Sequence, residues 1–265
     1  MTGTYRDGDS KRNYTYLYDR SMYTSMWVAY PLYADTFSGN HQYSGSWAPA
    51  TGNGFGTNNA NGYQINVWSA SYNVIYGQTN YVDNASSASE YYARGHQIPD
   101  ADRQFNEDMV QQTYYAINST PQIQNRFNGS IWSSLENAVR TQASGTDTLY
   151  VATGAAFDRA DIAGTESVTW ITPKGDPTKT CPVPNYYWKV LLKVTRDGSG
   201  TVTDACSIGF WFVHTTYDNS NYANYAVSVN EIESHTGLDL FANLPDGIEE
   251  TVESNSNWQT FQNYH

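Results

Sequence analysis

Two kinds of hydrophobic spacing divide the chain into expected helices and expected strands. Apolar residues at helical spacing run through 103–116 and 130–141, and the second stretch contains no proline or glycine. A compact apolar run at 26–30 predicts a buried strand. The other expected elements are weak strands at 64–67 and 72–75, central strands at 149–153, 186–195 and 202–214, and a short helix at 229–235. Because strands and helices do not alternate regularly, we predict an α+β fold with a mixed, largely antiparallel central sheet and flanking helices.

The polar stretches between these elements predict loops and turns within one domain. Residues 36–62 are rich in glycine, asparagine and serine, which favours long loops. The segment 197–200 is a turn signal between the last two central strands. No internal repeat or strong linker divides the chain. Its 265 residues can build one large core, and we expect a single domain over 1–265.

The charge of the chain limits the kinds of partner that its surface can bind. The formal net charge is -12, which argues against a protein that coats nucleic acid with a general basic surface. An enzyme that acts on a polyanion needs positive charge only in its cleft, and a divalent cation can supply part of it. No segment approaches the roughly 20 consecutive apolar residues that span a bilayer. No signal peptide is visible in residues 1–20, which are polar and rich in tyrosine.

The two cysteines, Cys181 and Cys206, lie in regions that we expect to form neighbouring strands. Their spacing has no metal-site pattern. A disulfide between them would imply an exported protein. The alternative is a pair of buried free thiols.

The stretch Arg94-Gly95-His96 carries the first candidate chemistry. The arginine guanidinium is planar and permanently charged, so it can recognise phosphate oxygens. The histidine titrates near neutral pH and can take a proton from water. The glycine between them permits a sharp bend of the backbone. Taken alone, however, such a histidine is more often structural than catalytic.

A second candidate set lies downstream, in and before the helix expected at 130–141. Asn128, Trp132, Glu136 and Arg140 are each four residues apart, so they form one slowly drifting stripe on a helix. We expect Asn128, which precedes a glycine, at the turn leading into that helix. Amide and carboxylate oxygens suit Mg²⁺, which keeps several waters. The alternative is an exposed helix in which Glu136 and Arg140 form an ordinary i,i+4 ion pair.

These motifs come in an order that resembles the DNA/RNA non-specific endonuclease family, whose active site is a ββα-metal (His-Me) finger. The motifs that carry the resemblance are Arg94-Gly95-His96, Asn118 with Thr120-Pro121-Gln122, and Asn128, Trp132, Glu136 and Arg140. The likeness continues through Tyr150-Val151-Ala152-Thr153-Gly154, Pro184 with Tyr187-Trp188-Lys189-Val190, and Ile232-Glu233 with Thr236-Gly237-Leu238-Asp239-Leu240-Phe241. It covers roughly residues 26–250, and residues 1–25 are a poorly matched N-terminal extension. Ala93 replaces the aspartate that opens the family motif, so a carboxylate that would help to fix the arginine or the finger is absent.

The resemblance implies a Mg²⁺-dependent or Mn²⁺-dependent endonuclease that cuts DNA, RNA or both without sequence specificity and leaves 5′-phosphate ends. It makes His96 the general base and Asn128 the only direct protein ligand of the metal. Glu136 would hold metal-bound waters, and Arg94 and Arg140 would bind phosphate oxygens. Asn118 would position the metal shell or the histidine. The pH profile should then rise through the histidine pKa, near 6.5 if it is unperturbed.

Two other classes of function compete with this interpretation. Ala93 and the acidic net charge suit a catalytically impaired relative that binds nucleic acid or another polyanion. The many tyrosines and tryptophans suit a secreted glycan-binding β-rich protein, although these residues are equally expected in strands and cores. For the nuclease we expect an exported location, periplasmic, cell-surface or extracellular. The family includes homodimers, so a homodimer is a further expectation.

Overall fold

The computed structural model describes most of the chain. The described residues are 2–4, 10–19, 21–22, 24–48, 50, 90–144, 148–162, 164, 166–171 and 181–264. The weak strands expected at 64–67 and 72–75 lie outside these residues, as does the loop region from 51 to 62. No helix within the described ranges is long and apolar enough to cross a membrane.

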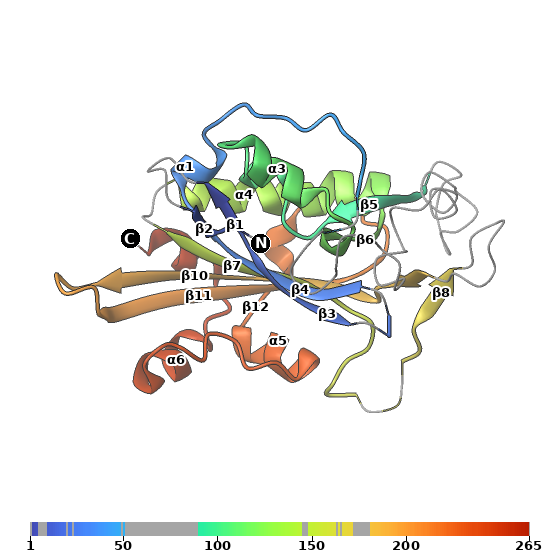
Figure 1. Ribbon diagram of the computed structural model, residues 1–265. Coiled ribbons are helices and arrows are strands. Elements are labelled where there is room, and N and C mark those ends of the chain that lie inside the picture. Colours follow the sequence, from blue (N-terminus) through green and yellow to red (C-terminus); the bar gives the residue numbers. More distant parts are fainter. Residues whose placement is uncertain are drawn as a thin grey trace.

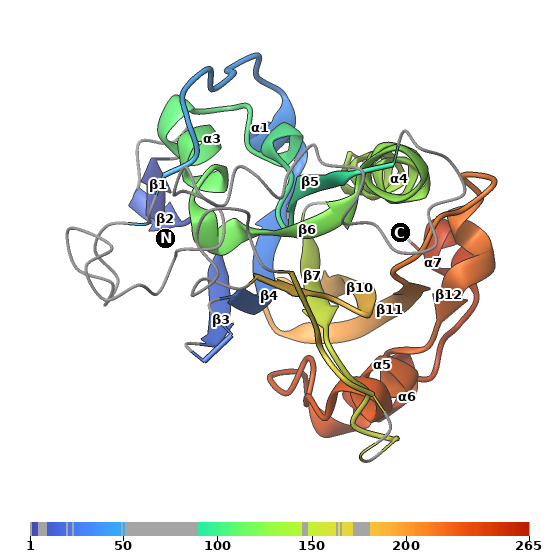
Figure 2. The same ribbon diagram turned by 90° about the vertical axis from the view of Figure 1, so that its right-hand side faces the viewer.

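An antiparallel sheet of six strands forms the centre of the molecule (Figure 1). Its strands, in spatial order, are β12 (Ala226–Val227), β11 (Val202–Val213), β10 (Tyr186–Arg196), β7 (Leu149–Ala156), β4 (Thr24–Leu32) and β3 (Thr15–Asp19). The described residues also form three small two-stranded sheets: β1 (Thr2–Thr4) with β2 (Ser10–Arg12), β5 (Tyr92–His96) with β6 (Ser119–Ile123), labelled in Figure 2, and β8 (Thr169–Ile171) with β9 (Cys181–Val183). The strands expected at 26–30, 149–153, 186–195 and 202–214 are confirmed as β4, β7, β10 and β11.

Helices cover both faces of the central sheet, so the fold is α+β as predicted. The helical segments are α1 (Ala34–Phe37), the 3-10 turn η3 (Asp100–Asp102), α3 (Glu107–Thr113), the 3-10 turn η4 (Ala116–Asn118), the π-helical η5 (Gln124–Trp132), α4 (Ser133–Ala143), the 3-10 turn η6 (Tyr222–Tyr225), α5 (Val229–Thr236), α6 (Asp246–Val252) and α7 (Trp258–Asn263). Figure 1 shows α3 and α4 on one side of the sheet and α5 and α6 on the other. The expected helix at 229–235 is confirmed as α5, which ends at Gly237 with a φ of 69°.

Strand β10 is buried on both sides, which explains its nearly continuous apolar sequence. Tyr187 and Leu191 pack in the core beneath α4, together with Leu135 of that helix. Trp188 and Val190 point the other way and pack against α5. Since side chains alternate along a strand, the charged Lys189 and Lys193 fall on the side of α4.

The predicted helices differ from the observed ones at their ends. The helix expected at 103–116 is shorter, since α3 begins only after Asn106, whose side-chain oxygen accepts a hydrogen bond from the Met109 backbone N–H at 3.2 Å. The helix expected at 130–141 starts earlier, because the π-helical η5 runs directly into α4. Asn128 therefore lies inside a helical segment and not at a turn before it, so that expectation was wrong.

The disulfide between Cys181 and Cys206 is not formed, and both thiols are free and buried. Of the two alternatives, the buried free thiols are confirmed. The expectation that the two cysteines lie on neighbouring strands was wrong. Cys181 is on β9, which pairs with β8 and precedes the first residue of β10. Cys206 lies on β11 opposite Lys193, near the other end of β10. The argument for export that rested on the disulfide therefore falls away.

Candidate active site

A hairpin of β5 and β6 holds His96 at one of its ends, opposite Ser119. Gly95 is part of the extended strand, so the bend expected at this glycine is absent. The glycine is required for another reason: a Cβ atom there would come within 2.2 Å of the Gln122 side chain on β6. Close packing between the two strands therefore requires a glycine at this position.

The imidazole of His96 is enclosed by two aromatic rings. Its ring centroid lies 4.7 Å from that of Trp47 and 4.9 Å from that of Tyr114. Its Nε2 atom is shielded from solvent and has no hydrogen-bond partner among the described residues. Burial lowers the pKa of His96 to about 4, and the nearby carboxylate of Asp100 opposes this shift only in part. His96 therefore stays mostly neutral down to about pH 4, whereas an unperturbed histidine with a pKa near 6.5 would be mostly protonated there. The neutral form is the one that a general base requires.

Asn118 is fully engaged in fixing the chain next to His96. Its side-chain oxygen accepts from the Ile98 backbone N–H at 3.0 Å, and its Nδ2 donates to the carbonyls of Ile98 at 2.9 Å and Thr113 at 2.8 Å. Its own carbonyl accepts from the Gln97 N–H at 2.9 Å. The residue is completely buried, so these bonds make it a clamp on the segment that follows the histidine.

The helix after the hairpin presents Asn128 with one end of its amide already occupied. The Asn128 Nδ2 atom donates to Gln124 Oε1 at 3.0 Å, one turn earlier in η5. This bond orients the amide and leaves its oxygen available as an acceptor or a metal ligand. Trp132, which shares the four-residue spacing, is buried in the core and stacks on Phe127. The stripe expected from the four-residue spacing is thus partly buried, with Trp132 in the core and the other three residues partly exposed.

Arg140 forms its ion pair with Asp102, a residue that the sequence did not single out. Its Nη1 atom lies 2.8 Å from Asp102 Oδ1, and its Nη2 donates to Asn137 Oδ1 at 2.6 Å. Tyr30 donates to the other Asp102 oxygen at 2.9 Å. Thus Arg140 is held by Asp102, and the simple i,i+4 pair with Glu136 is not the arrangement in this region.

Glu136 is partly buried, with both positively and negatively charged side chains near it. Burial raises its pKa, while Lys189 and Arg140 act in the opposite direction. Lys189 is buried on β10, where its Nζ lies 4.9 Å from the centroid of the Trp132 ring. That ammonium has no hydrogen-bond partner within the described part of the chain, so the negative charge of Glu136 is its main electrostatic partner. Asp100 lies within electrostatic range of both Glu136 and His96, which joins the two halves of the site.

The residues present suit a hard cation that keeps most of its water. No group of three or more histidine, cysteine, aspartate or glutamate side chains that could hold a metal occurs in the described ranges. A dedicated zinc or calcium cage is therefore not formed by them. One oriented amide oxygen from Asn128 and one carboxylate from Glu136, further along the continuous η5–α4 helical segment, match the sparse ligation that Mg²⁺ accepts.

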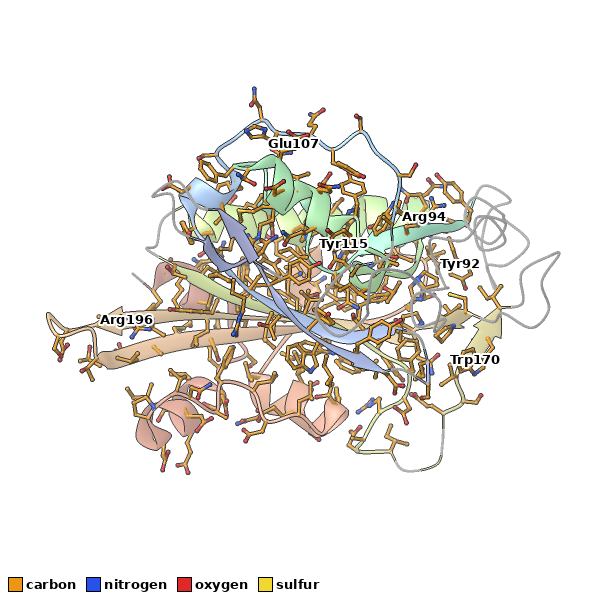
Figure 3. All side chains as sticks on the ribbon, viewed as in Figure 1. Tyr92, Arg94, Glu107, Tyr115, Trp170 and Arg196 are labelled. Atoms are coloured by element: carbon orange, nitrogen blue, oxygen red, sulfur yellow. The ribbon has the colours of Figure 1, made fainter. Side chains whose placement is uncertain are left out.

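Position 93 faces away from the arginine that follows it. Ala93 pairs with Gln122, whereas Arg94 pairs with Pro121, and successive side chains on a strand point to opposite faces. Figure 3 shows Tyr92 and Arg94 along β5. The residue at 93 therefore projects toward the face of Gln122, and a carboxylate there would not extend directly beside Arg94.

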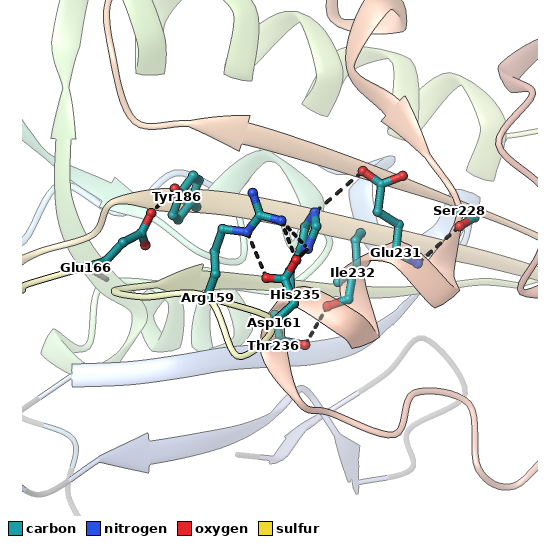
Figure 4. A network of polar contacts seen from close by, with 9 residues as sticks. All are labelled: Arg159, Asp161, Glu166, Tyr186, Ser228, Glu231, Ile232, His235 and Thr236. Carbon is teal, nitrogen blue, oxygen red and sulfur yellow. Dashed lines mark hydrogen bonds and ion pairs between the residues drawn. The ribbon is translucent and has the colours of Figure 1, made fainter. Parts of the chain in front are cut away.

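A separate polar network lies on the face of the sheet covered by α5 (Figure 4). Arg159 donates to both oxygens of Asp161, at 2.9 Å and 2.6 Å, and its Nη2 lies 3.0 Å from His235 Nδ1. Arg159 and Asp161 are partly exposed, whereas His235 is buried, and exposed ion pairs such as Arg159 with Asp161 contribute little to stability. None of the predicted site residues belongs to it, so we interpret it as a tie between α5 and the loop after β7.

The arrangement of the site residues on the hairpin and the helix after it defines a class of protein. A histidine on the first strand of a hairpin, with an amide and a carboxylate on the helix that follows the hairpin, is the arrangement of the ββα finger nucleases. The chain belongs to the DNA/RNA non-specific endonuclease family, whose sequence profile matches residues 2–247.

Curated relatives agree with this membership. The chain is 29% identical over 159 residues to "Nuclease 1, mitochondrial" of Schizosaccharomyces pombe, a match that covers 59% of this chain and 48% of that protein. It is 30% identical over 166 residues to a nuclease of Nostoc sp., covering 62% and 55%. It is 29% identical over 165 residues to a nuclease of Serratia marcescens, covering 61% and 55%. These matches span about half the length of the relatives.

A solved structure shares the fold over nearly the whole chain. The match is to a crystal structure of an EndoG/EndoGI complex, with a TM-score of 0.64 and 18% sequence identity. It covers 91% of this chain and 87% of that one. At this identity the likeness concerns the fold alone, and it confirms the predicted α+β class.

Proposed function

We propose that this protein is a metal-dependent endonuclease that hydrolyses phosphodiester bonds of DNA, RNA or both without sequence specificity. The observation that carries the proposal is the state of His96 Nε2, a buried acceptor without a partner among the described residues. A structural histidine would have its ring nitrogens satisfied, whereas a base needs a free lone pair for the attacking water. Family membership supports the same activity.

In this proposal each residue has a defined task. Neutral His96 accepts a proton at Nε2 from the water that attacks the phosphorus atom. Arg94 and Arg140 bind the phosphate oxygens, and Asn118 keeps the segment after His96 in place. The contacts are made to the phosphate backbone, so base sequence is not read. Cleavage leaves 5′-phosphate ends.

Asn128 and Glu136 are the residues that would hold Mg²⁺ or Mn²⁺, the first through its amide oxygen and the second through water. When bound, the cation would supply Lewis-acid stabilisation of the charge that develops on the phosphate and the leaving oxygen. Holding such a cation next to the arginines creates local positive charge in a protein whose net charge is -12.

The same proposal extends to the organisation and location of the protein. We propose a single nuclease domain over residues 1–265, an exported location, and a homodimer as its assembly. Two of the relatives are named as mitochondrial nucleases.

A plasmid-nicking assay with Mg²⁺, and with EDTA as its control, tests the activity. We expect Asn128→Ala to lower the cleavage rate at least about 10-fold and to raise the Mg²⁺ concentration required, as loss of a ligand does. The matched control is Asn125→Ala, an exposed asparagine in the same helical segment, which should cleave like the wild type. Unchanged cleavage in EDTA would contradict the metal dependence. A wild-type protein that leaves the plasmid intact in Mg²⁺ would instead favour a catalytically impaired, polyanion-binding relative.

A further inference from the structure

The segment 38–48 runs beside the chain that connects β5 and β6, and it is fixed at both of its ends. At the first end, the His41 N–H donates to the Gln104 carbonyl at 3.1 Å, and Gly39 packs so closely on that carbonyl that a Cβ would overlap it. At the second end, the Ala48 N–H donates to the Tyr114 carbonyl at 3.2 Å, and the Ala48 carbonyl accepts from the Ala116 N–H at 2.9 Å. The segment is therefore held against the chain between β5 and β6, the same connection whose ends Asn118 fixes beside His96.

Between these anchors the segment contributes two aromatic rings next to the proposed base. Tyr43 lies 5.0 Å from Tyr114 between ring centroids, and Trp47 lies 5.2 Å from the same ring. Trp47 is also the ring that lies 4.7 Å from His96. Tyr43, Trp47 and Tyr114 are all partly exposed, so the group reaches the surface immediately beside a catalytic histidine. We call these three residues the aromatic group.

Carboxylates close to the site offset part of its positive charge. Arg140 is already paired with the carboxylate of Asp102, and Asp100 places a second carboxylate at the site, where it accepts from the Tyr114 hydroxyl at 2.8 Å. The net charge of -12 offers no general basic surface to compensate. Stacking of a base on an aromatic ring does not depend on net charge, and it is a principal source of affinity in proteins that bind single strands.

We propose that the aromatic group is a stacking platform for an unpaired nucleobase next to the scissile phosphate, with Trp47 as its main ring. This inference rests on the proposed nuclease function and names its preferred substrate: single-stranded nucleic acid, or a duplex in which a base has left the stack. A base stacked on Trp47 lies within the span of one nucleotide from His96. Bases in an intact duplex are already stacked on one another and cannot use the platform without distortion.

Paired kinetic measurements on single-stranded and double-stranded oligonucleotides of the same sequence test the preference. We expect Trp47→Ala to lower kcat/KM for the single strand about 5- to 150-fold, the range for loss of one stacked base. The value for the duplex should change by less than about 3-fold, and Trp47→Phe should keep most of the single-strand activity. Trp170→Ala is the control, because Trp170 is an exposed tryptophan on β8, outside the β5–β6 hairpin. It should change kcat/KM for neither substrate.

A binding measurement separates this inference from the proposed function. In EDTA, fluorescence anisotropy with a labelled single-stranded oligonucleotide should show weaker binding by Trp47→Ala, within the same 5- to 150-fold range. An oligonucleotide with abasic positions should bind the wild type and Trp47→Ala equally. Equal loss of activity on both substrates, or faster cleavage of both, would overturn the platform and make Trp47 a support or a cover for His96. A wild type that cleaves neither substrate would contradict the nuclease function, while the binding result would still decide whether the platform exists.

Discussion

A histidine lies at each end of the β5–β6 hairpin: His96 belongs to β5, whereas His214 follows β11 and contacts the hairpin through Ile123. At the end where His96 pairs with Ser119, the ring Nε2 has no hydrogen-bond partner among the described residues. At the other end, His214 is bonded through both nitrogens: Nε2 accepts from the Ile123 N–H at 3.0 Å, and Nδ1 donates to the Pro184 carbonyl at 2.9 Å.

Burial affects the two rings alike, since it lowers the pKa of each to about 4. A lowered pKa therefore does not distinguish a reactive histidine from a structural one in this fold. The distinguishing property is the unsatisfied acceptor, which costs about 1–3 kcal/mol when it is buried. A cost of this kind persists where the group has a function that compensates for it.

Replacement of His96 should produce the largest effect on activity. We expect His96→Ala to lower the cleavage rate by roughly 10²- to 10⁴-fold, because the proton acceptor is lost. Its free energy of unfolding should fall only by about 0.5–1.5 kcal/mol, because the ring contacts with Trp47 and Tyr114 are lost but no hydrogen bond of Nε2 is removed. Plasmid nicking and urea denaturation measure the two quantities. Retention of a tenth of the activity would assign the role of base to another group.

Replacement of His214 should produce the opposite pattern. His214→Ala leaves the Ile123 N–H and the Pro184 carbonyl without their partners, which should reduce the free energy of unfolding by about 1–3 kcal/mol. The folded fraction should cleave at a rate within about 3-fold of the wild type. A large loss of activity without loss of stability would show that the comparison between the two ends is mistaken.

The sequence predicted most of the fold because its elements carry strong local signals. The apolar runs of β7, β10 and β11 and the polar turn at 197–200 predicted the central strands. The π-helical start of η5 has no such local signal, because the residues around Asn128 and Gly129 equally suit a turn. The two cysteines were expected on neighbouring strands, which left a disulfide and free thiols as alternatives. That expectation was wrong because strand order depends on tertiary packing that spacing alone does not show.

The site residues also divide into those with a signal in the sequence and those that only tertiary packing brings into the site. His96, Asn128 and Glu136 were found from their chemistry and order, and their roles stay predictions. Asp102 could not be assigned to Arg140 from sequence, because 38 residues separate the two and their pairing depends on how η3 packs against α4. Trp47 was missed for the same reason, since only the packing of 38–48 beside the chain that connects β5 and β6 brings its ring to His96. The sequence signal available for Lys189 was its charge within an otherwise apolar strand.

The pH dependence of stability gives the smallest and sharpest test of the two histidines. Both have pKa values lowered to about 4, whereas the unfolded chain titrates them near 6.5. Below pH 6.5 the unfolded state therefore binds more protons, so the stabilisation is complete above pH 6.5 and is lost as the pH falls toward 4.

Removing either histidine should make this acid loss shallower by a similar amount. We expect the free energies of unfolding of His96→Ala and His214→Ala to fall less steeply than that of the wild type between pH 6.5 and 4.5, as measured in urea at half-unit intervals. The difference for each is at most about 1.4 kcal/mol per unit of pKa shift. A wild-type slope in His96→Ala would mean that the His96 ring is open to solvent and titrates normally. The acid limb of the cleavage profile should then also return to pH 6.5, and the aromatic enclosure would lose its effect on the base.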